Sequence, residues 1–331
     1  MHTELTLKDI YLAQQRIAGL AERTPLLRSE SLSRRWDCDV WLKLDNLQPT
    51  GAFKLRGAVN ALLGLDDAQR ERGVVTMSTG NFGRALAYAG KHLAIAVTVC
   101  ISKLVPDNKV AALRESGAQV VIVGDTQDDA DIEARRLQQE QGLAYISPFD
   151  DPLVIAGQGT CGLEIMEQQP QIDTVFAGLS GGGLIAGIGL AVKSINPNAE
   201  VIGVSMNQGA AMLESLAAGK PVQVQEVASL ADSLGGGIGL ENAWTFAMTQ
   251  RYMDRGFRVD EEQIARAMLH LFNHQRLVVE GAAAVGIAAV EQHQINLRGR
   301  QVALVISGQN LSNNTFAQAC QLAGEANYAH L

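Results

Sequence analysis

Between residues 73 and 149, short apolar stretches alternate with longer stretches that carry an apolar residue every three or four positions. The apolar stretches lie at 74–77, 94–101, 119–123 and 144–146, and the helical patterns lie at 84–92, 106–116 and 127–141. Strands that alternate with helices in this way predict a parallel sheet joined by right-handed crossovers. The alternation therefore places this part of the chain in the α/β class.

A similar alternation continues after residue 150. Strand patterns lie at 174–177, 200–204 and 301–306, and helical patterns at 153–168, 184–195, 209–218, 242–250, 261–275 and 281–293. Near the N-terminus, a helical pattern at 4–20 precedes a short strand at 40–44 and a helix from about 54 to 63. A chain of 331 residues is long for one compact core and sufficient for two α/β lobes.

Composition excludes several classes of function. Hydrophobic residues make up 47% of the chain and charged residues 19%, which predicts a folded interior with little disorder. The net charge of −8 and the lack of a basic run disfavour binding to nucleic acid or to an anionic membrane. No apolar run reaches the ~18 residues that span a bilayer, and the N-terminus lacks a signal-peptide core. Four scattered cysteines fit neither a metal motif nor a disulfide framework, so we expect a reduced, cytoplasmic protein.

One lysine lies at a predicted junction between a loop and a helix. Pro49 and Gly51 predict a turn, and the helical pattern begins near Lys54, which follows Phe53. Partial desolvation at such a junction disfavours the ammonium form and exposes the free amine as a nucleophile. The alternative is a solvated lysine on a helix surface, which is the commoner situation.

The segment from Lys43 to Ala58 resembles the signature around the cofactor lysine in the serine/threonine dehydratase family of pyridoxal phosphate (PLP) enzymes. Asp45 stands where that family usually has Glu, and Ala52 where it usually has Ser. The resemblance implies PLP as cofactor, with Lys54 as its covalent anchor and Phe53 beside it. It also implies the two-lobed, tryptophan-synthase-β-like fold known as fold type II, in which each lobe is a mainly parallel twisted sheet flanked by helices.

The same resemblance implies how the chain divides into domains. A small substrate-binding domain at 73–149 would be inserted into a large PLP-binding domain built from 1–72 and 150–331. A homodimer is usual for the family. Biosynthetic members carry a C-terminal regulatory domain, and we expect none here because the sequence ends soon after its last predicted strand.

A glycine run follows the strand at 174–177 and opens a helix. Glycine lets backbone N–H groups approach an anion closely, and a helix N-terminus adds a favourable partial charge. The run matches the family's phosphate loop, with a serine in place of the first glycine. The residues that would hold the cofactor phosphate are Ser180, Gly181, Gly182, Gly183 and Leu184.

A dinucleotide is the competing ligand for this run. Gly181, Gly183 and Ala186 fit a loose Rossmann fingerprint, which also requires an acidic residue about 20 positions further on. The next strand instead ends in Ser205 and Met206, so the fingerprint is incomplete. A tight turn without any ligand is the remaining alternative.

A second polar loop joins the strand at 74–77 to a helix and suits a carboxylate. It resembles the family's Ser-Ser-Gly-Asn-His-Gly loop, which holds the substrate carboxylate and whose Asn contacts the 3′-oxygen of the cofactor. A plain helix cap by Ser78 or Thr79 is compatible with that role. Thr79 replaces the second Ser of the family loop and Phe82 its His. The implied substrate-binding residues are Ser78, Thr79, Gly80, Asn81 and Phe82.

Three further stations match the family. Ser307 would hydrogen-bond the pyridine nitrogen, and Glu280 would lie near the 3′-oxygen, although a turn and an exposed helix-start acid are the respective alternatives. Residues 231–237 resemble a stretch that lines the site, or else form a flexible loop. A serine hydroxyl leaves the ring nitrogen neutral, which makes the ring a poorer electron sink. This favours loss of a β-substituent over transamination.

These stations together predict a PLP-dependent ammonia-lyase that converts a β-hydroxy amino acid to a 2-oxo acid and ammonia by α,β-elimination. Lys54 would also serve as the base at Cα. Residues 204–212 and 233–240 resemble the threonine-dehydratase-like enzymes of hydroxyectoine utilisation, so the substrate would be threonine, serine or a hydroxyectoine-derived amino acid.

Two alternatives from other functional classes stay open. A racemase of the same fold needs an acid or base on the face opposite Lys54, where the hydroxyl of Thr79 would lie. A catalytically silent PLP- or amino-acid-binding protein is the other. No metal is expected, because Ser205 stands where metal-activated members of the family carry an acid.

Overall fold

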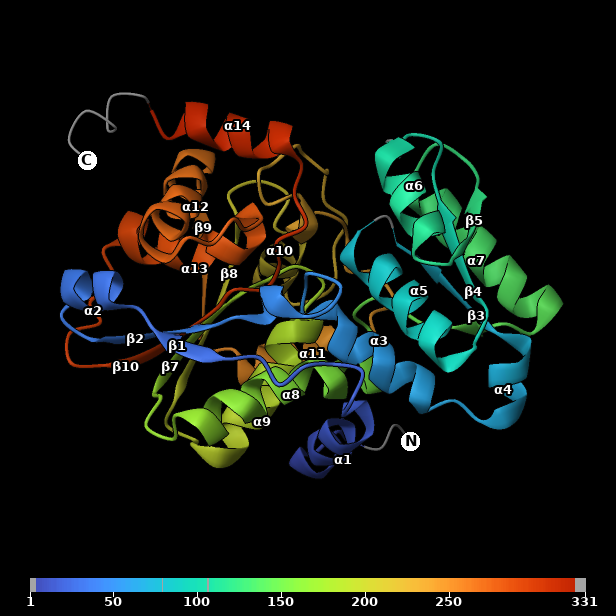
Figure 1. The fold of residues 1–331 in the computed structure, drawn as a ribbon, viewed down its shortest axis with the longest axis horizontal. Coiled ribbons are helices and arrows are strands. Elements are labelled where there is room, and N and C mark those ends of the chain that lie inside the picture. Colours follow the sequence, from blue (N-terminus) through green and yellow to red (C-terminus); the bar gives the residue numbers. More distant parts are fainter. Residues whose placement is uncertain (1–3, 79, 106, 325–331) are drawn as a thin grey trace.

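The computed structural model describes residues 4–78, 80–105 and 107–324, and it contains two sheets (Figure 1). The six-stranded sheet has the order β1 (Leu26–Arg28), β2 (Asp39–Lys43), β10 (Gln301–Val305), β7 (Thr174–Gly178), β8 (Glu200–Met206) and β9 (Arg255–Val259). The four-stranded sheet has the order β5 (Gln119–Ile122), β4 (Val97–Ile101), β3 (Val74–Met77) and β6 (Ala144–Tyr145). Every pairing is parallel except β1 with β2.

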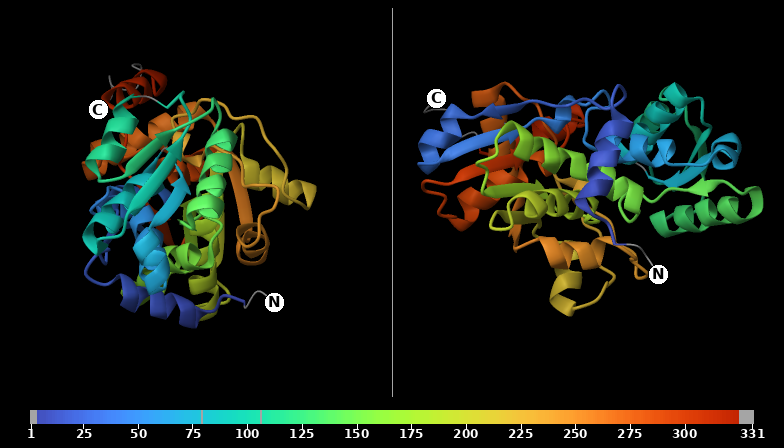
Figure 2. Two further views of the ribbon diagram at one scale, coloured as in Figure 1. Left: turned by 90° about the vertical axis from the view of Figure 1, so that its right-hand side faces the viewer. Right: turned by 90° about the horizontal axis from the view of Figure 1, so that it is seen from below.

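Helices cover both faces of the six-stranded sheet, which lies beside the four-stranded one (Figure 2). Along β10, Val302 and Leu304 pack against α12 (Glu261–Gln275) and α13 (Gly281–His293), whereas Ala303 and Val305 pack on the side of α8 (Pro152–Gln168) and α9 (Gly183–Ile195). This alternation follows from the two-residue period of a strand. Both faces of the sheet are therefore buried, as parallel sheets require.

The remaining helices lie around the two sheets. They are α1 (Leu7–Ile17), α2 (Glu30–Trp36), α3 (Lys54–Leu63), α4 (Asp67–Arg72), α5 (Asn81–Leu93), α6 (Asp107–Glu115), α7 (Gln127–Gln141), α10 (Ala211–Ala218), α11 (Thr245–Tyr252) and α14 (Asn313–Leu322). The 3₁₀ turns η1 (Asp45–Leu47) and η2 (Asp232–Leu234) lie in loops.

Helix α3 packs against elements of both parts of the chain. Leu55 and Val59 belong to the same buried cluster as Phe82 and Val99 of the four-stranded unit (residues 74–145). The other side of α3 crosses α8, where Gly57 permits close approach, because a Cβ there would collide with the side-chain amide of Gln158. The lysine at the start of α3 is thus placed where the two units meet.

Several sequence-based boundaries were wrong. The predicted helix 4–20 is shorter, and the strand predicted from residue 94 begins at Val97 because Ala94 adopts a left-handed conformation with φ 55°. Helix α5 begins three residues earlier than predicted, and β8 extends to Met206, so Ser205 lies within the strand. Five elements were missed: β1, α2, α4, β9 and α14.

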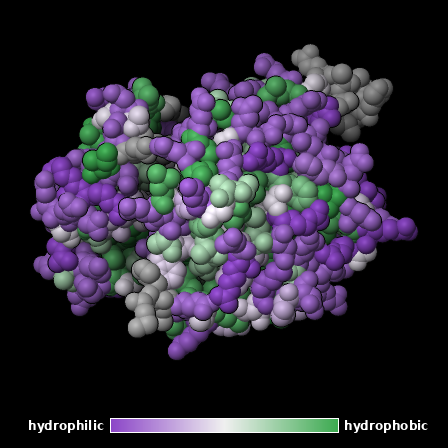
Figure 3. All heavy atoms as spheres, turned by 180° about the vertical axis from the view of Figure 1, so that it is seen from behind, coloured by the Kyte–Doolittle hydropathy of each residue, from purple (hydrophilic) through white to green (hydrophobic). Residues whose placement is uncertain are grey.

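The surface view in Figure 3 is dominated by hydrophilic residues, with smaller hydrophobic areas between them. This distribution matches the burial of most large apolar side chains in the clusters beside the two sheets. No helix within residues 4–78, 80–105 and 107–324 combines the length and apolar character needed to cross a membrane.

Candidate active site

Lys54 is the first residue of α3, and the turn before it is fixed to the end of β10. The backbone N–H of Phe53 donates to the carbonyl oxygen of Ser307 at 2.9 Å, and Ala52 forms an antiparallel bridge with Gly308. The ammonium nitrogen of Lys54 donates to the carbonyl oxygen of Pro148 at 2.7 Å. The predicted loop-to-helix junction is therefore observed, and it lies against the carboxyl end of a central strand.

The surroundings of Lys54 favour its neutral form. Its Nζ lies 5.3 Å from the ring centroid of Phe53 and 5.7 Å from that of Phe82. Desolvation lowers the pKa of Lys54 to about 8, although the charge of Glu280 acts in the opposite direction. At pH 8 about half of such lysines are free amines, whereas an ordinary lysine with a pKa of ~10.4 is almost wholly protonated. A free amine near neutral pH is the form that attacks a carbonyl carbon.

The glycine run forms the N-terminus of α9, a helix of 13 residues. Gly182 is its N-cap and has a φ of 89°, which favours glycine. Gly181 and Gly183 lie against Phe149, where a Cβ on either residue would approach the Phe149 ring or backbone. Pro148, which accepts the hydrogen bond from Lys54, directly precedes Phe149. The lysine and the glycine run therefore both contact the dipeptide Pro148-Phe149.

Asn81 begins α5, and its side chain contacts the part of the chain that contains the six-stranded sheet, which we call the six-stranded unit. Its side-chain amide donates to the two carboxylate oxygens of Glu280 at 2.8 and 3.2 Å. The predicted cap by Ser78 is observed in part: Gly80 is the N-cap residue, and the Ser78 hydroxyl accepts from the backbone N–H of Gly83, in the first turn of α5, at 3.1 Å. The racemase alternative assigned Thr79 as the acid or base opposite Lys54. Thr79 lies outside the described residues.

Glu280 is the N-cap of α13 and is only 3% exposed, so the alternative of an exposed helix-start acid is wrong. Burial raises its pKa above the ordinary value, while hydrogen bonds from Asn81, Ser233 and the Asn310 backbone act against that rise. Gly308 makes room for it, since a Cβ at that position would overlap the carboxylate. The stretch at 231–237 begins beside this helix start, since a Cβ on Gly281 would lie 2.9 Å from the backbone nitrogen of Ala231.

A buried ionic network includes Arg56, which lies in α3 two residues after Lys54. Arg56 donates to Asp45 at 2.8 Å and to Glu164 at 2.6 Å, and Lys43 donates to Glu164 at 2.6 Å. These four side chains are between 0 and 4% exposed, and their charges sum to zero. Thr24 contributes a hydroxyl donor to Asp45 at 2.6 Å.

Lys43, Asp45 and Arg56 lie within the predicted lysine motif, but the acidic partner that joins them was not predicted. Glu164 lies in the middle of a helix of low amphipathicity and more than 100 residues further along the chain. Asn310, Pro148 and Phe149 were missed for the same reason, since each meets its partner only through the tertiary fold. An acid within the long apolar stretch of α8 was the one available signal.

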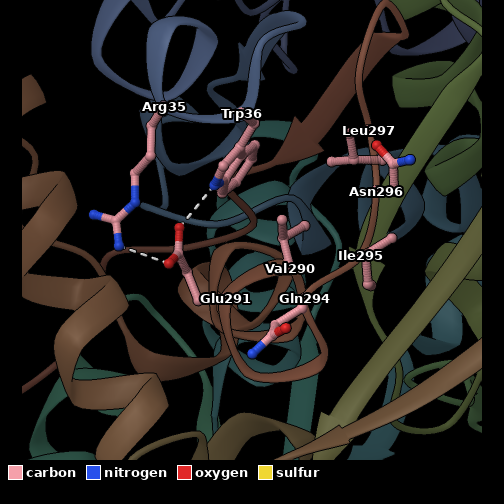
Figure 4. A pocket seen from close by; sticks show the side chains of 8 residues that line it. All are labelled: Arg35, Trp36, Val290, Glu291, Gln294, Ile295, Asn296 and Leu297. Atoms are coloured by element: carbon pink, nitrogen blue, oxygen red, sulfur yellow. Dashed lines mark hydrogen bonds and ion pairs between the residues drawn. The ribbon is translucent and has the colours of Figure 1, made fainter.

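The surface pocket in Figure 4 is separate from these residues. It has a volume of about 300 Å³ and lies between the end of α2 and the end of α13. The carboxylate of Glu291 in it accepts from Arg35 at 2.6 Å and from the indole N–H of Trp36 at 2.7 Å. Its central acid is thus already paired within the protein, and no predicted site residue lines the pocket.

Comparison with known proteins identifies the family. Residues 17–308 match the family described as pyridoxal-phosphate dependent enzyme. The chain belongs to this family. A Sinorhizobium fredii protein that carries a provisional threonine dehydratase name is 52% identical to this PLP enzyme over 309 residues, which cover 93% of each chain. The L-threonine ammonia-lyase of Thermotoga maritima is 40% identical over 94% of this chain and 77% of its own.

Solved structures agree with the sequence relatives. Maize serine racemase matches this PLP enzyme with a TM-score of 0.89 and 32% identity, over 98% of this chain and 100% of its own. The predicted serine/threonine dehydratase family, the α/β fold of type II, PLP as cofactor and the lyase class are confirmed.

We predict little activation of this enzyme by divalent cations. Hard cations require oxygen ligands, preferably anionic ones, and the described part of the chain holds no group of three His, Cys, Asp or Glu side chains suited to a metal. Ser205 offers only a buried hydroxyl. Turnover measured with and without Mg²⁺ or Ca²⁺ should agree within a factor of about two. A several-fold stimulation that a chelator reverses would contradict this expectation.

Proposed function

We propose that this enzyme is an ammonia-lyase that converts a β-hydroxy amino acid of the threonine type to a 2-oxo acid and ammonia. The observation that carries the proposal is the position of Lys54 at the start of α3, where its amine donates to the Pro148 carbonyl oxygen next to the glycine run, and where desolvation lowers its pKa to about 8. The names of relatives at 40 and 52% identity support the same reaction. A hydroxyectoine-derived amino acid is the finer candidate that the sequence resemblance suggests.

The residues present fit PLP in their chemistry. The N-terminus of α9 offers free backbone N–H groups for a phosphate at Ser180, Gly181, Gly182, Gly183 and Leu184. We assign the pyridine nitrogen to the hydroxyl of Ser307, a residue whose backbone carbonyl accepts from the N–H of Phe53 beside Lys54. We assign Asn81 and Glu280 to the side of the cofactor that carries its 3′-oxygen, and Lys54 to its covalent attachment. When bound, PLP supplies the electron sink for the reaction.

The protein side chains then perform the remaining tasks. The neutral Nζ of Lys54 would accept the proton from Cα of the bound substrate. We assign the substrate carboxylate to the start of α5, where Gly80 is the N-cap and a helix N-terminus favours an anion, next to Ser78 and Asn81. The β-hydroxyl leaves with one proton as water. The released enamine acid tautomerises to an imine, and one water molecule hydrolyses this imine to the 2-oxo acid and ammonia.

We further propose that residues 73–149 form the substrate-binding domain and that 1–72 with 150–331 form the PLP-binding domain. Helix α3 extends the core of the smaller domain, because its apolar side chains pack there. A cytoplasmic homodimer completes the proposal. Sedimentation of the purified enzyme tests the dimer independently of its activity.

The test of the reaction is a screen of β-hydroxy amino acids with two products measured in parallel. We expect equimolar ammonia and 2-oxo acid, with 2-oxobutyrate from threonine. Interconversion of L- and D-serine without 2-oxo acid would instead support the racemase, for which the similarity to maize serine racemase is a specific reason. Bound PLP without turnover of any tested amino acid would support the silent binding protein.

Phe82 predicts a preference for the larger substrates. Its ring lies 5.7 Å from Lys54 Nζ and so faces the reacting amine, while the residue also packs into the core of the four-stranded unit. A β-substituent larger than that of serine would bury additional apolar area against it, at roughly 25 cal/mol per Å². We therefore expect kcat/KM for threonine to exceed that for serine by several-fold, and Phe82→His to narrow the difference. A preference for serine, or an unchanged ranking in the variant, would contradict this prediction.

A further inference from the structure

Four polar groups form a connected set across the two units beside Lys54. The side-chain amide of Asn310 donates to the carbonyl oxygen of Thr50 and to Oδ1 of Asn81, each at 2.8 Å. Asn81 in turn donates to the carboxylate of Glu280 at 2.8 Å. The backbone N–H of Asn310 also stabilises the ionised carboxylate of Glu280, so Asn81, Glu280 and Asn310 form one connected group. We call these three residues the amide ring.

The direction of each hydrogen bond in the amide ring is fixed by its ends. A backbone carbonyl can only accept, so the atom of Asn310 that faces Thr50 is the NH₂ group. That NH₂ group has a second N–H, which points at Asn81 and requires an oxygen there. The NH₂ group of Asn81 is therefore the part of its amide that faces the carboxylate of Glu280, which also accepts. Neither amide can be reversed without placing two acceptors in contact.

Asn310 is itself held by the turn that precedes the lysine. The backbone N–H of Gln309 donates to the carbonyl oxygen of Gly51 at 2.9 Å. Gly51 has a φ of 74°, and a Cβ there would lie 2.6 Å from Oδ1 of Asn310. The amide of Asn310 therefore has little freedom to rotate, and it transmits the position of the lysine turn to the first residue of α5.

We propose that Asn310 is a positioning residue that orients the Asn81 amide and holds the start of α5 against the lysine turn. The role of Asn81 toward the cofactor rests on the proposed function, whereas the effect of Asn310 on Asn81 does not. Loss of the Asn310 amide removes the donor that holds Oδ1 of Asn81, which loosens the orientation of Asn81, and it removes a contact between the four-stranded and six-stranded units. Asn310 acts through Asn81 and has no assigned contact with the substrate.

The first test uses the apoenzyme, so it does not depend on turnover. Asn310→Ala should increase amide hydrogen exchange in the first turn of α5 and weaken PLP binding by about tenfold, the effect of one or two lost hydrogen bonds. Gln309→Ala is the matched control: its side chain pairs with Asn46 at 3.1 Å and lies outside the amide ring. The control should leave exchange in α5 and the PLP dissociation constant within a factor of about two.

A double-mutant cycle separates positioning from general damage. In the background Asn81→Ala, replacing Asn310 should have little further effect on PLP affinity, because the residue through which it acts is missing. Asn310→Ser, which retains one donor, should lie between wild type and Asn310→Ala and provides a milder variant if the alanine protein does not fold. Additive effects on PLP affinity in the cycle, or equal loss in Gln309→Ala, would overturn the proposal. If the wild-type enzyme shows no lyase activity, only the proposed function is overturned.

Discussion

Lys54→Ala is expected to abolish turnover while the protein remains folded. The variant loses the covalent anchor for PLP and the base at the substrate Cα, and a base alone contributes about 10²–10⁴ to the rate. Among the described residues, the side chain of Lys54 makes one hydrogen bond, to the Pro148 carbonyl, and alanine has the highest helix propensity. We therefore expect a reduction in kcat of at least about 10³, with loss of the visible absorbance of lysine-bound PLP and a melting temperature close to that of wild type.

Two companion variants sharpen this result. Lys54→Arg keeps a cation at the same position but cannot supply a neutral amine, so it should be as inactive as the alanine variant. Lys91→Ala removes an exposed lysine from α5 and should retain full activity. Substantial release of 2-oxo acid by Lys54→Ala would show that another group removes the proton and would overturn the assignment.

The fold could be predicted to the extent that it depends on local periodicity. The parallel strands β3, β4 and β5 were recognised because each is a short apolar stretch with helical patterns on either side. β1 and β9 were not predicted, and they form the two edges of the six-stranded sheet. β1 has only three residues, and β9 carries arginines where the central strands carry apolar residues. Edge strands carry less of the apolar pattern on which such predictions depend.

The candidate site was predictable only where its residues follow strands. Lys54, Gly182 and Asn81 all lie at loop-to-helix junctions, which the sequence marks with glycine, proline and small polar residues. The residues that join these stations carry no such marks. Asn310 finds Asn81 across 229 positions, and Glu164 finds Arg56 across 108, so only the tertiary fold brings them together.

The second large effect is expected on stability. Arg56→Met removes the cation that Asp45 and Glu164 share, in a place where all three side chains are at most 4% exposed. Replacing a buried pair with apolar groups can be neutral, but removing one partner typically costs about 3–5 kcal/mol, because a buried charge is left unpaired. We expect a loss of this size in the free energy of unfolding measured with urea. Arg28→Met, which breaks exposed contacts to Asp39, should cost at most about 1 kcal/mol.

The loss in Arg56→Met should also depend on pH, and the sign follows from Asp45. Burial alone would raise the pKa of Asp45, but in the wild type the charge and hydrogen bonds of Arg56 hold it below the ordinary value. Without Arg56, desolvation dominates and the carboxyl pKa rises. The folded variant then binds more protons than its unfolded chain, so its stability increases as the pH falls toward the unfolded pKa of ~3.9. The wild-type carboxylate stays ionised over the same range.

The difference in unfolding free energy between wild type and Arg56→Met should therefore narrow from pH 8 to pH 5. Arg28→Met provides the baseline, because Asp39 is exposed and its contacts contribute little at either pH. A deficit in Arg56→Met that is no larger than that baseline would show that the network adds little to folding. A large deficit that stays constant with pH would show that lost packing of the guanidinium, rather than an unpaired carboxylate, destabilises the variant.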